Sequence, residues 1–131
     1  MDALWSSFDV IYCLTLRTRP ERRQQAEAQF ASVGLTRHVI FLEEEPDEMD
    51  GKRGCFMAHQ RASKLAIESG ANYALIFEDD VEFLPHFSSH AASRVLAFLS
   101  NPASPTWSIF FLGHFPRALL LLPRAAAVLC V

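Results

Sequence analysis

Hydrophobic and polar residues follow one another in blocks along the chain, and the blocks predict alternating strands and helices. Short, nearly continuous apolar runs predict strands that are buried on both faces of a sheet. Longer segments with an apolar residue every three or four positions predict helices that cover the sheet. By this pattern we expect strands at residues 8–16, 37–42, 74–77 and 107–112, and helices that begin at Pro20, at Cys55 and after Pro85.

Glycine and proline indicate where these elements begin and end. Pro20 suits the first turn of the first helix, and Gly34 and Gly70 are placed to end the first and second helices. Residues 43–54 are acidic, contain proline and glycine and lack an apolar period, so they predict a solvated loop. The inner faces of the second and third helices are expected to carry Cys55, Ala58, His59, Ala62, Leu65 and Ala66, and Phe87, Ala91, Val95, Phe98 and Leu99.

The repeat of strand and helix predicts an α/β fold with a mostly parallel sheet and helices on both faces. In such a sheet, ligands bind beyond the carboxyl ends of the strands. Two charged segments are expected there: Glu78-Asp79-Asp80 follows one apolar run, and an arginine-rich turn, residues 17–23, follows the first strand. Carboxylates with a metal, together with arginines at a helix start, would suit a nucleotide diphosphate.

The acidic triplet predicts a cation site if its side chains converge. Successive side chains of a strand point to opposite faces, but in a turn neighbouring carboxylates can approach one point. Their repulsion then requires a counter-charge, which a hard divalent cation supplies while leaving positions for diphosphate oxygens. Both segments have a plainer alternative. The triplet would be a solvated acidic turn, and the arginines a solvated helix face paired with Glu21 and Glu27.

Composition narrows the class of protein. A chain of 131 residues, half of them hydrophobic, predicts one folded domain, and a formal net charge of -3 argues against nucleic-acid binding. Three cysteines at unrelated spacings in apolar surroundings predict reduced thiols. No signal peptide is expected, because the first residues lack a basic flank before an apolar core, and no transmembrane segment, because Pro123 and Arg124 interrupt the apolar tail. We therefore expect a cytoplasmic protein, with peripheral attachment to a membrane left open.

Five segments form an ordered set: LTLRTRPERR (residues 14–23), Asp50-Gly51, GCFMAH (54–59), ALIFEDDVEF (74–83) and WSIFFLG (107–113). Read together, they resemble glycosyltransferase family 25. That family includes galactosyltransferases of bacterial lipooligosaccharide and lipopolysaccharide biosynthesis and the collagen hydroxylysine galactosyltransferases. The resemblance implies a Rossmann-like GT-A type fold, a UDP-sugar donor, a manganese or magnesium ion and inversion at the anomeric carbon.

The resemblance extends to individual residues. Asp79 and Asp80, with Glu78, match the acidic motif that is expected to hold the metal and the diphosphate and ribose of the donor. Arg22 matches an arginine expected near the donor nucleotide. His59 matches a histidine that is expected in a supporting role near the donor pocket. Cofactor-binding residues are thus expected at Arg22, His59, Glu78, Asp79 and Asp80, and metal ligands at Asp79 and Asp80.

The chain also departs from the family pattern. Thr15 stands where the family usually has Asn, and Ala58 replaces a Ser. After Gly113, residues 118–131 resemble a later strand and helix start, which implies that an acceptor-side segment is skipped. We therefore expect a single glycosyltransferase domain over residues 1–131, with a donor-binding half at 8–113, a shortened tail at 114–131 and a sheet that is incomplete at the C-terminal end.

Two functions follow as hypotheses. The first is a hexosyltransferase that moves a hexose, galactose by the family pattern, from a UDP-sugar to a hydroxyl group of a glycan or of hydroxylysine. The second is a non-catalytic remnant that binds a nucleotide sugar or acts as an interaction module. An inverting transfer requires a general base, for which the sequence offers no candidate, so the catalytic residues are unassigned.

Histidine and cysteine admit other interpretations. His59 on an inner helix face is by default a core histidine that has found a hydrogen-bond partner. Cys55 and His59, and likewise His86 and His90, have the one-turn spacing that lets two ligands on a helix share a metal. Together they would compose a tetrahedral zinc site if the two helices were adjacent.

Overall fold

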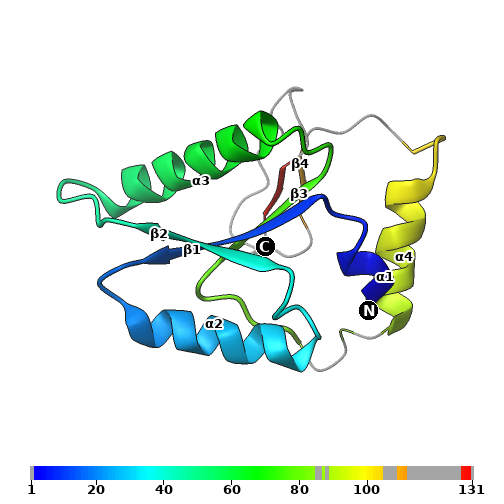
Figure 1. The fold of residues 1–131 in the computed structure, drawn as a ribbon, viewed down its shortest axis with the longest axis horizontal. Coiled ribbons are helices and arrows are strands. Elements are labelled where there is room, and N and C mark those ends of the chain that lie inside the picture. Colours follow the sequence, from blue (N-terminus) through cyan, green and yellow to red (C-terminus); the bar gives the residue numbers. More distant parts are fainter. Residues whose placement is uncertain (1, 85–86, 88, 105–108, 112–127, 131) are drawn as a thin grey trace.

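The computed structural model describes residues 2–84, 87, 89–104, 109–111 and 128–130, and these residues contain one five-stranded sheet (Figure 1). Its strand order is β2-β1-β3-β5-β4, and every pair is parallel. The strands are β1 (Val10–Leu16), β2 (Val39–Glu44), β3 (Ala74–Glu78), β4 (Ile109–Phe111) and β5 (Val128–Cys130). The helices are α1 (Asp2–Trp5), α2 (Pro20–Ser32), α3 (Gly51–Glu68) and α4 (Ser89–Ser100). The predicted α/β class with an open, parallel sheet is confirmed.

The strand order reverses at β1. From β1 the chain crosses to β2 on one side of that strand, and it later returns as β3 on the other side. The side chain of Asp9 joins the starts of β1 and β3, because its Oδ2 accepts the backbone N–H groups of Asn72 at 2.8 Å and Tyr73 at 2.9 Å. Sheets with such a reversal bind ligands beyond the carboxyl ends of the two strands that flank it.

Helices cover both faces of the sheet, with α3 above the strands and α2 below them in Figure 1. Side chains along β1 alternate between two cores: Ile11 and Cys13 face one, and Tyr12 and Leu14 face the other. The first core also contains residues of α1, α2 and α4. The second is closed by the small side chains of α3, namely Ala58, Ala62 and Ala66. The prediction of helices on both faces is therefore confirmed.

Helix α3 begins at Gly51 and not at the predicted Cys55. Asp50 is its N-cap, and the Asp50 carboxylate accepts a backbone N–H of the first turn at 2.9 Å. Strand β2 also continues to Glu44. The prediction of a loop over residues 43–54 is thus wrong at both ends, because an aspartate cap can start a helix before any apolar period is visible.

A short helix at the N-terminal end, α1, was not predicted. Leu4 and Trp5 of this helix are each 1% exposed and belong to the first core. Trp5 Nε1 donates a hydrogen bond to the carbonyl oxygen of Val33 at 2.9 Å, and the Trp5 ring stacks on Phe87 with centroids 5.9 Å apart. A helix of 4 residues is too short to show a period in the sequence.

The inner face of α3 is narrower than predicted. Cys55 is exposed and Leu65 is 43% exposed, so the assignment of these two residues to the core is wrong. They flank the stripe of alanines that faces the sheet, and these small side chains bury only a narrow part of the surface of α3. Cys13 is buried in apolar surroundings as predicted. On α4 the buried residue is Ala92 rather than the predicted Ala91.

Some predicted features lie outside the described residues. Of the strand expected at 107–112, residues 109–111 are described as β4. His86 and most of the tail expected at 114–131 lie outside the described part of the chain. Within the described part, no helix combines the length and hydropathy that crossing a membrane requires.

Candidate functional site

A cleft of about 210 Å³ lies at the carboxyl ends of β1, β2 and β3, beside the start of α3. It occupies the position where the strand order reverses, which is where an open parallel sheet binds ligands. Residues that line it come from five elements and the connections between them, and they include Thr15 and Leu16 of β1, Arg22 of α2, Glu44 of β2, Gly54, Cys55 and Ala58 of α3, and Glu78 and Asp79 at the end of β3.

Asp79 is a buried charged residue directly after β3, with 8% of its surface exposed. Leu14 pairs with Glu78 in parallel register, so the residues that follow them in the chain, Thr15 and Asp79, lie side by side. Thr15 Oγ1 donates a hydrogen bond to Asp79 Oδ2 at 3.0 Å, and Arg22 Nη1 donates one to Asp79 Oδ1 at 3.3 Å. Each carboxylate oxygen therefore has a donor, as the burial of a charge requires.

Arg22 faces two carboxylates from the first turn of α2, which Pro20 begins. Its Nη1 lies 3.3 Å from Asp79 Oδ1 and 3.8 Å from Asp80 Oδ2. A cation is unfavourable near a helix N-terminus, where the backbone dipole is positive, and the two carboxylates offset this cost. The Asp80 side chain is 64% exposed, so this side of the site is open to solvent.

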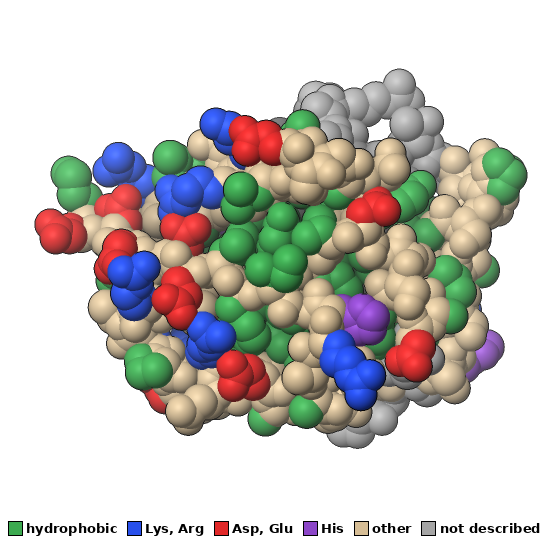
Figure 2. Space-filling model, in the orientation of Figure 1, with side chains coloured by type: hydrophobic (Ala, Val, Ile, Leu, Met, Phe, Trp, Pro, Cys, Tyr) green, Lys and Arg blue, Asp and Glu red, His purple; other side chains and the backbone are tan. Residues whose placement is uncertain are grey.

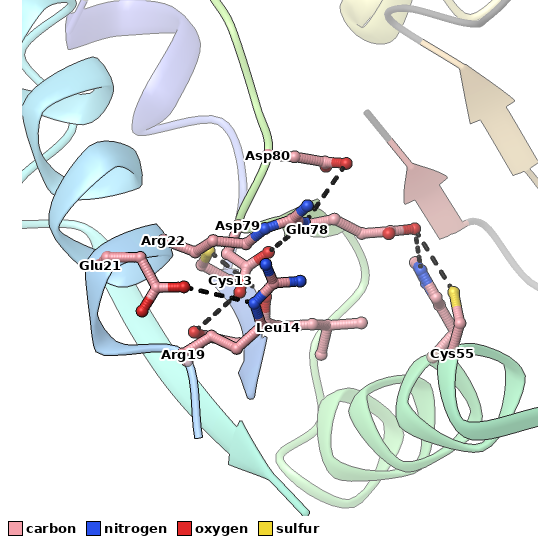
Figure 3. Close-up of polar contacts among 11 residues, drawn as sticks. Cys13, Leu14, Arg19, Glu21, Arg22, Cys55, Glu78, Asp79 and Asp80 are labelled. Carbon is pink, nitrogen blue, oxygen red and sulfur yellow. Dashed lines mark hydrogen bonds and ion pairs between the residues drawn. The ribbon is translucent and has the colours of Figure 1, made fainter. Parts of the chain in front are cut away.

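Glu78 points away from the other two members of the acidic triplet, toward α3 (Figure 3). Its Oε1 lies 3.0 Å from His59 Nε2 and 3.6 Å from Cys55 Sγ. The hydrogen bond with His59 lowers the pKa of Glu78 below its ordinary value, against the opposing effect of partial burial. Glu78 is still part of the strand, so its side chain and that of Asp79 take opposite faces. The three carboxylates therefore do not converge on one point.

One group of side chains in the described part of the chain has the ligand types and the spacing that a metal ion requires. It consists of Cys55, His59 and Glu78, whose ligand atoms all lie within 4.8 Å of one another. The four-residue zinc set considered from the sequence is not assembled, because His90 is not part of this group and His86 lies outside the described residues.

Charged side chains of both signs gather at the end of the molecule where β1 and β2 finish (Figure 2). The arginine-rich turn supplies most of the cations, and its ion-pairing alternative is confirmed for Arg23, which bonds to Glu27 at 3.1 Å. Only Arg22 of this turn contacts Asp79 among the ion pairs of the described residues. Other pairs at this end include Arg23 with Glu43 at 2.6 Å, Arg17 with Glu45 at 3.0 Å, and Arg61 with Glu44.

The connection between β2 and α3 forms one wall of the cleft. Asp47 organises it, because its Oδ1 accepts the backbone N–H groups of Asp50 at 3.0 Å and Met49 at 2.9 Å. These two hydrogen bonds lower the pKa of Asp47. A Cβ atom on Gly54 would lie 3.0 Å from the Cβ of Asp47, so glycine lets the loop pack against the helix.

The structure thus groups the predicted site residues on two sides. Arg22, Asp79 and Asp80 lie together against α2, and His59 and Glu78 lie together against α3. Sequence reasoning missed Thr15 as the donor to Asp79, although a parallel register that aligns the ends of β1 and β3 would have indicated it. It also missed the contact between Cys55 and Glu78, because an apolar helical period assigned that cysteine to the core.

Comparison with known proteins identifies relatives of the chain. A family model described as "Glycosyltransferase family 25 (LPS biosynthesis protein)" matches residues 48–104, which include α3, β3 and the acidic triplet. A "Glycosyltransferase 25 family member" of Drosophila melanogaster is 28% identical over 133 aligned positions, which cover 82% of this chain and 21% of the relative. A protein of the same name from Drosophila pseudoobscura pseudoobscura is 30% identical over 115 positions, which cover 69% of this chain and 18% of the relative.

No solved structure matches the chain at a significant level. The chain spans about a fifth of the length of the two curated relatives. The family model and both relatives agree on the same assignment, and the matched residues contain Glu78, Asp79 and Asp80. Residues 48–104 therefore match glycosyltransferase family 25, and the chain is similar to two curated members of that family.

Proposed function

We propose that the cleft binds the nucleoside diphosphate of a UDP-sugar, and that the protein transfers a hexose, galactose by the family pattern, to a hydroxyl group of a glycan or of hydroxylysine. The observation that carries this proposal is the buried Asp79, bonded to Thr15 and Arg22 at the carboxyl end of β3. Open parallel sheets bind ligands at such a position. The match to the family supports transferase chemistry, and the family pattern implies a GT-A type fold and inversion at the anomeric carbon.

Asp79 and Asp80 have the chemistry to hold a hard divalent cation. Their carboxylate oxygens already approach one cationic atom, Arg22 Nη1, at 3.3 and 3.8 Å. Oxygen ligands of this kind suit manganese or magnesium. When bound, such an ion stabilises the negative charge that develops on a leaving nucleotide. The guanidinium of Arg22 would contribute hydrogen bonds to phosphate oxygens, which it can bind in bidentate fashion.

His59 is proposed as a positioning residue at the donor pocket. Its Nε2 lies 3.0 Å from Glu78 Oε1, and Glu78 lines the cleft. The pair would hold the α3 side of the pocket while Asp79 and Arg22 hold the α2 side. An inverting transfer also requires a group that accepts the proton of the acceptor hydroxyl, and among the described residues we assign that role to none.

Thermal unfolding in the presence of UDP and manganese tests donor binding. A ligand that binds only the native state raises the melting temperature, and at about 100 times its Kd it contributes about 2.7 kcal/mol. We expect a rise of several degrees that requires manganese. An Asp79→Asn, Asp80→Asn double variant should lose the manganese-dependent rise. Glu82→Gln is the matched control, since it removes an exposed carboxylate outside the cleft lining and should keep it.

A second measurement distinguishes a transferase from a binding module. Release of UDP from UDP-galactose is followed with and without a hydroxylysine or glycan acceptor. Release that depends on the acceptor supports transfer. Manganese-dependent stabilisation by UDP without any such release favours a nucleotide-sugar binding module. A folded chain that UDP does not stabilise would exclude both uses of the cleft.

A further inference from the structure

Cys55, His59 and Glu78 form a second cluster whose chemistry differs from that of the aspartate pair. We propose that these three side chains bind Zn²⁺, or another divalent cation that accepts a thiolate ligand, at the α3 side of the cleft. The inference goes beyond donor binding, because its type of metal and its test are independent of UDP. Asp79 and Asp80 offer oxygen alone, whereas this cluster offers sulfur, nitrogen and oxygen.

The distances within the cluster are close to those that zinc requires. Glu78 Oε1 lies 3.0 Å from His59 Nε2 and 3.6 Å from Cys55 Sγ. Typical zinc bonds of about 2.3 Å to sulfur and about 2.0–2.2 Å to nitrogen and oxygen place tetrahedral ligand atoms about 3.3–3.6 Å apart. The two pairs that include Glu78 therefore differ from tetrahedral separations by only a few tenths of an ångström, and the third pair, Cys55 with His59, lies within 4.8 Å.

Secondary structure holds the ligands in place. Cys55 and His59 are one turn apart on α3, so their side chains project from the same side of that helix. The Asp50 cap and the close packing at Gly54 define where the helix begins. Glu78 comes from the end of β3, a strand buried at its other positions. The site is thus built from two rigid elements that are far apart in the sequence.

Three protein ligands leave one tetrahedral position for a further ligand. Structural zinc sites usually have four protein ligands, whereas sites with three leave a position for water or substrate. Cys55 and Glu78 both line the cleft, and Cys55 is exposed, so an ion at this cluster would be accessible from the cleft. The fourth ligand would be water, or an oxygen atom of a molecule bound in the cleft.

Metal binding at this cluster should release a proton. In the metal-free state the Cys55 thiol donates to Glu78 Oε1, which also shares a hydrogen bond with His59. Metal binding forms an S–metal bond and breaks the S–H bond, and the thiol proton passes to solvent. The sulfur keeps its electron pair, so no oxidant or reductant takes part. Binding should therefore weaken as the pH falls.

Cobalt and zinc titrations of the chelator-treated, 131-residue chain test the site. Co²⁺ reports a thiolate ligand directly through a charge-transfer absorption in the near ultraviolet. We expect this band to appear with one equivalent of Co²⁺ and to disappear when Zn²⁺ displaces it. Zinc should also protect Cys55 from alkylation, as mapped by peptide mass spectrometry, without UDP being present.

Variants identify the ligands. Cys55→Ser should abolish the charge-transfer band, and His59→Ala should weaken zinc binding at least about tenfold, since the loss of even an outer-shell partner costs 10–100-fold. His38→Ala removes an exposed histidine outside the cluster and should bind zinc as the wild type does. Absence of a thiolate band in the wild-type chain, or of zinc protection at Cys55, would overturn the proposal, and neither result depends on whether a variant folds.

Discussion

At the residue scale, the site depends on a polar unit of Thr15, Arg22 and Asp79 at the carboxyl end of the sheet. Two donors satisfy one buried carboxylate, at 3.0 Å from the hydroxyl and 3.3 Å from the guanidinium. Asp79 is held by contacts within the protein, and Asp80 is largely exposed. The unit therefore combines one aspartate fixed by the fold with one that is accessible to a ligand.

Replacing Thr15 by valine should destabilise the chain. Valine has nearly the same shape but no hydroxyl, so one oxygen of the buried Asp79 carboxylate loses its donor. The free energy of unfolding, measured with urea, should fall by about 1–3 kcal/mol. Thr15→Ser keeps the hydroxyl, so its free energy of unfolding should fall less. Equal stability of the valine variant and the wild type would mean that water replaces the hydroxyl without cost.

The thiols of Cys13 and Cys55 should differ strongly in reactivity. Burial, with a smaller effect from the charge of Asp79, raises the pKa of Cys13 to about 12, whereas Cys55 is exposed. At pH 8 only about one Cys13 thiol in ten thousand is then ionised, and the thiolate is the reactive form. In metal-free buffer, iodoacetamide should label Cys55 of the native chain and Cys13 only after unfolding. Rapid labelling of native Cys13 would contradict the buried position.

At the element scale, the start of α3 controls the wall of the cleft. Asp47 closes the preceding turn, Asp50 caps the helix, and Gly54 lets the two pack together. This wall carries Cys55, so its geometry also determines whether the cluster with His59 and Glu78 forms. The loop is therefore a structural part of the site.

Alanine substitutions at two glycines of α3 provide a matched pair. A Cβ at Gly54 would lie 3.0 Å from the Cβ of Asp47, whereas a Cβ at Gly51 meets nothing within 4 Å. Gly51→Ala should be neutral or should stabilise the chain by up to about 1 kcal/mol, since alanine favours helix. The free energy of unfolding of Gly54→Ala should be lower than that of Gly51→Ala by about 1 kcal/mol or more, so Gly54→Ala should unfold at a lower urea concentration. Equal stabilities of the two variants would show that the loop at Asp47 moves to accommodate the added Cβ without a measurable cost.

The turn at Asp47 should stabilise the chain at neutral pH and lose this effect in acid. Backbone hydrogen bonds from Asp50 and Met49 lower the pKa of Asp47 in the folded chain, below its value of about 3.9 in the unfolded chain. A lowered folded pKa means that the contribution is present above the unfolded pKa and is lost as the pH falls through the folded pKa. Asp47→Asn keeps an acceptor but not the charge. It should reduce stability at pH 7 and lessen the further loss between pH 5 and 2. Parallel stability curves for both proteins would contradict this effect.

At the scale of the whole molecule, the order of the strands creates the site. Because β2 and β3 flank β1, the segments that follow β1 and β3 meet at one end of the sheet. Arg22 and Asp79, which are far apart in the sequence, are thereby brought to 3.3 Å. The charged rim in Figure 2 surrounds this same end. The chain spans about a fifth of the length of its curated relatives.

The sequence predicts the parallel sheet and the position of the arginine-rich turn and the acidic triplet at the carboxyl ends of its strands, because apolar runs and the carboxyl-end rule depend on local pattern and general topology. It does not predict the division of the acidic triplet. Whether Glu78 remains in the strand depends on its register with Leu14, and that register is set by packing over the entire sheet. The same limit applies to α1, which is held by Trp5 in the core and not by its own length.

Calorimetric titration with UDP and manganese tests the central claim, that the cleft beside Asp79 and Arg22 is a donor site. We expect the wild-type chain to bind UDP, and Arg22→Ala to bind it at least about tenfold more weakly, the effect of losing a hydrogen bond to a charged group. Arg37→Ala, which removes an exposed arginine outside the cleft lining, should bind as the wild type does. Equal affinities of Arg22→Ala and the wild type, or no binding by a chain that circular dichroism shows to be folded, would contradict the claim.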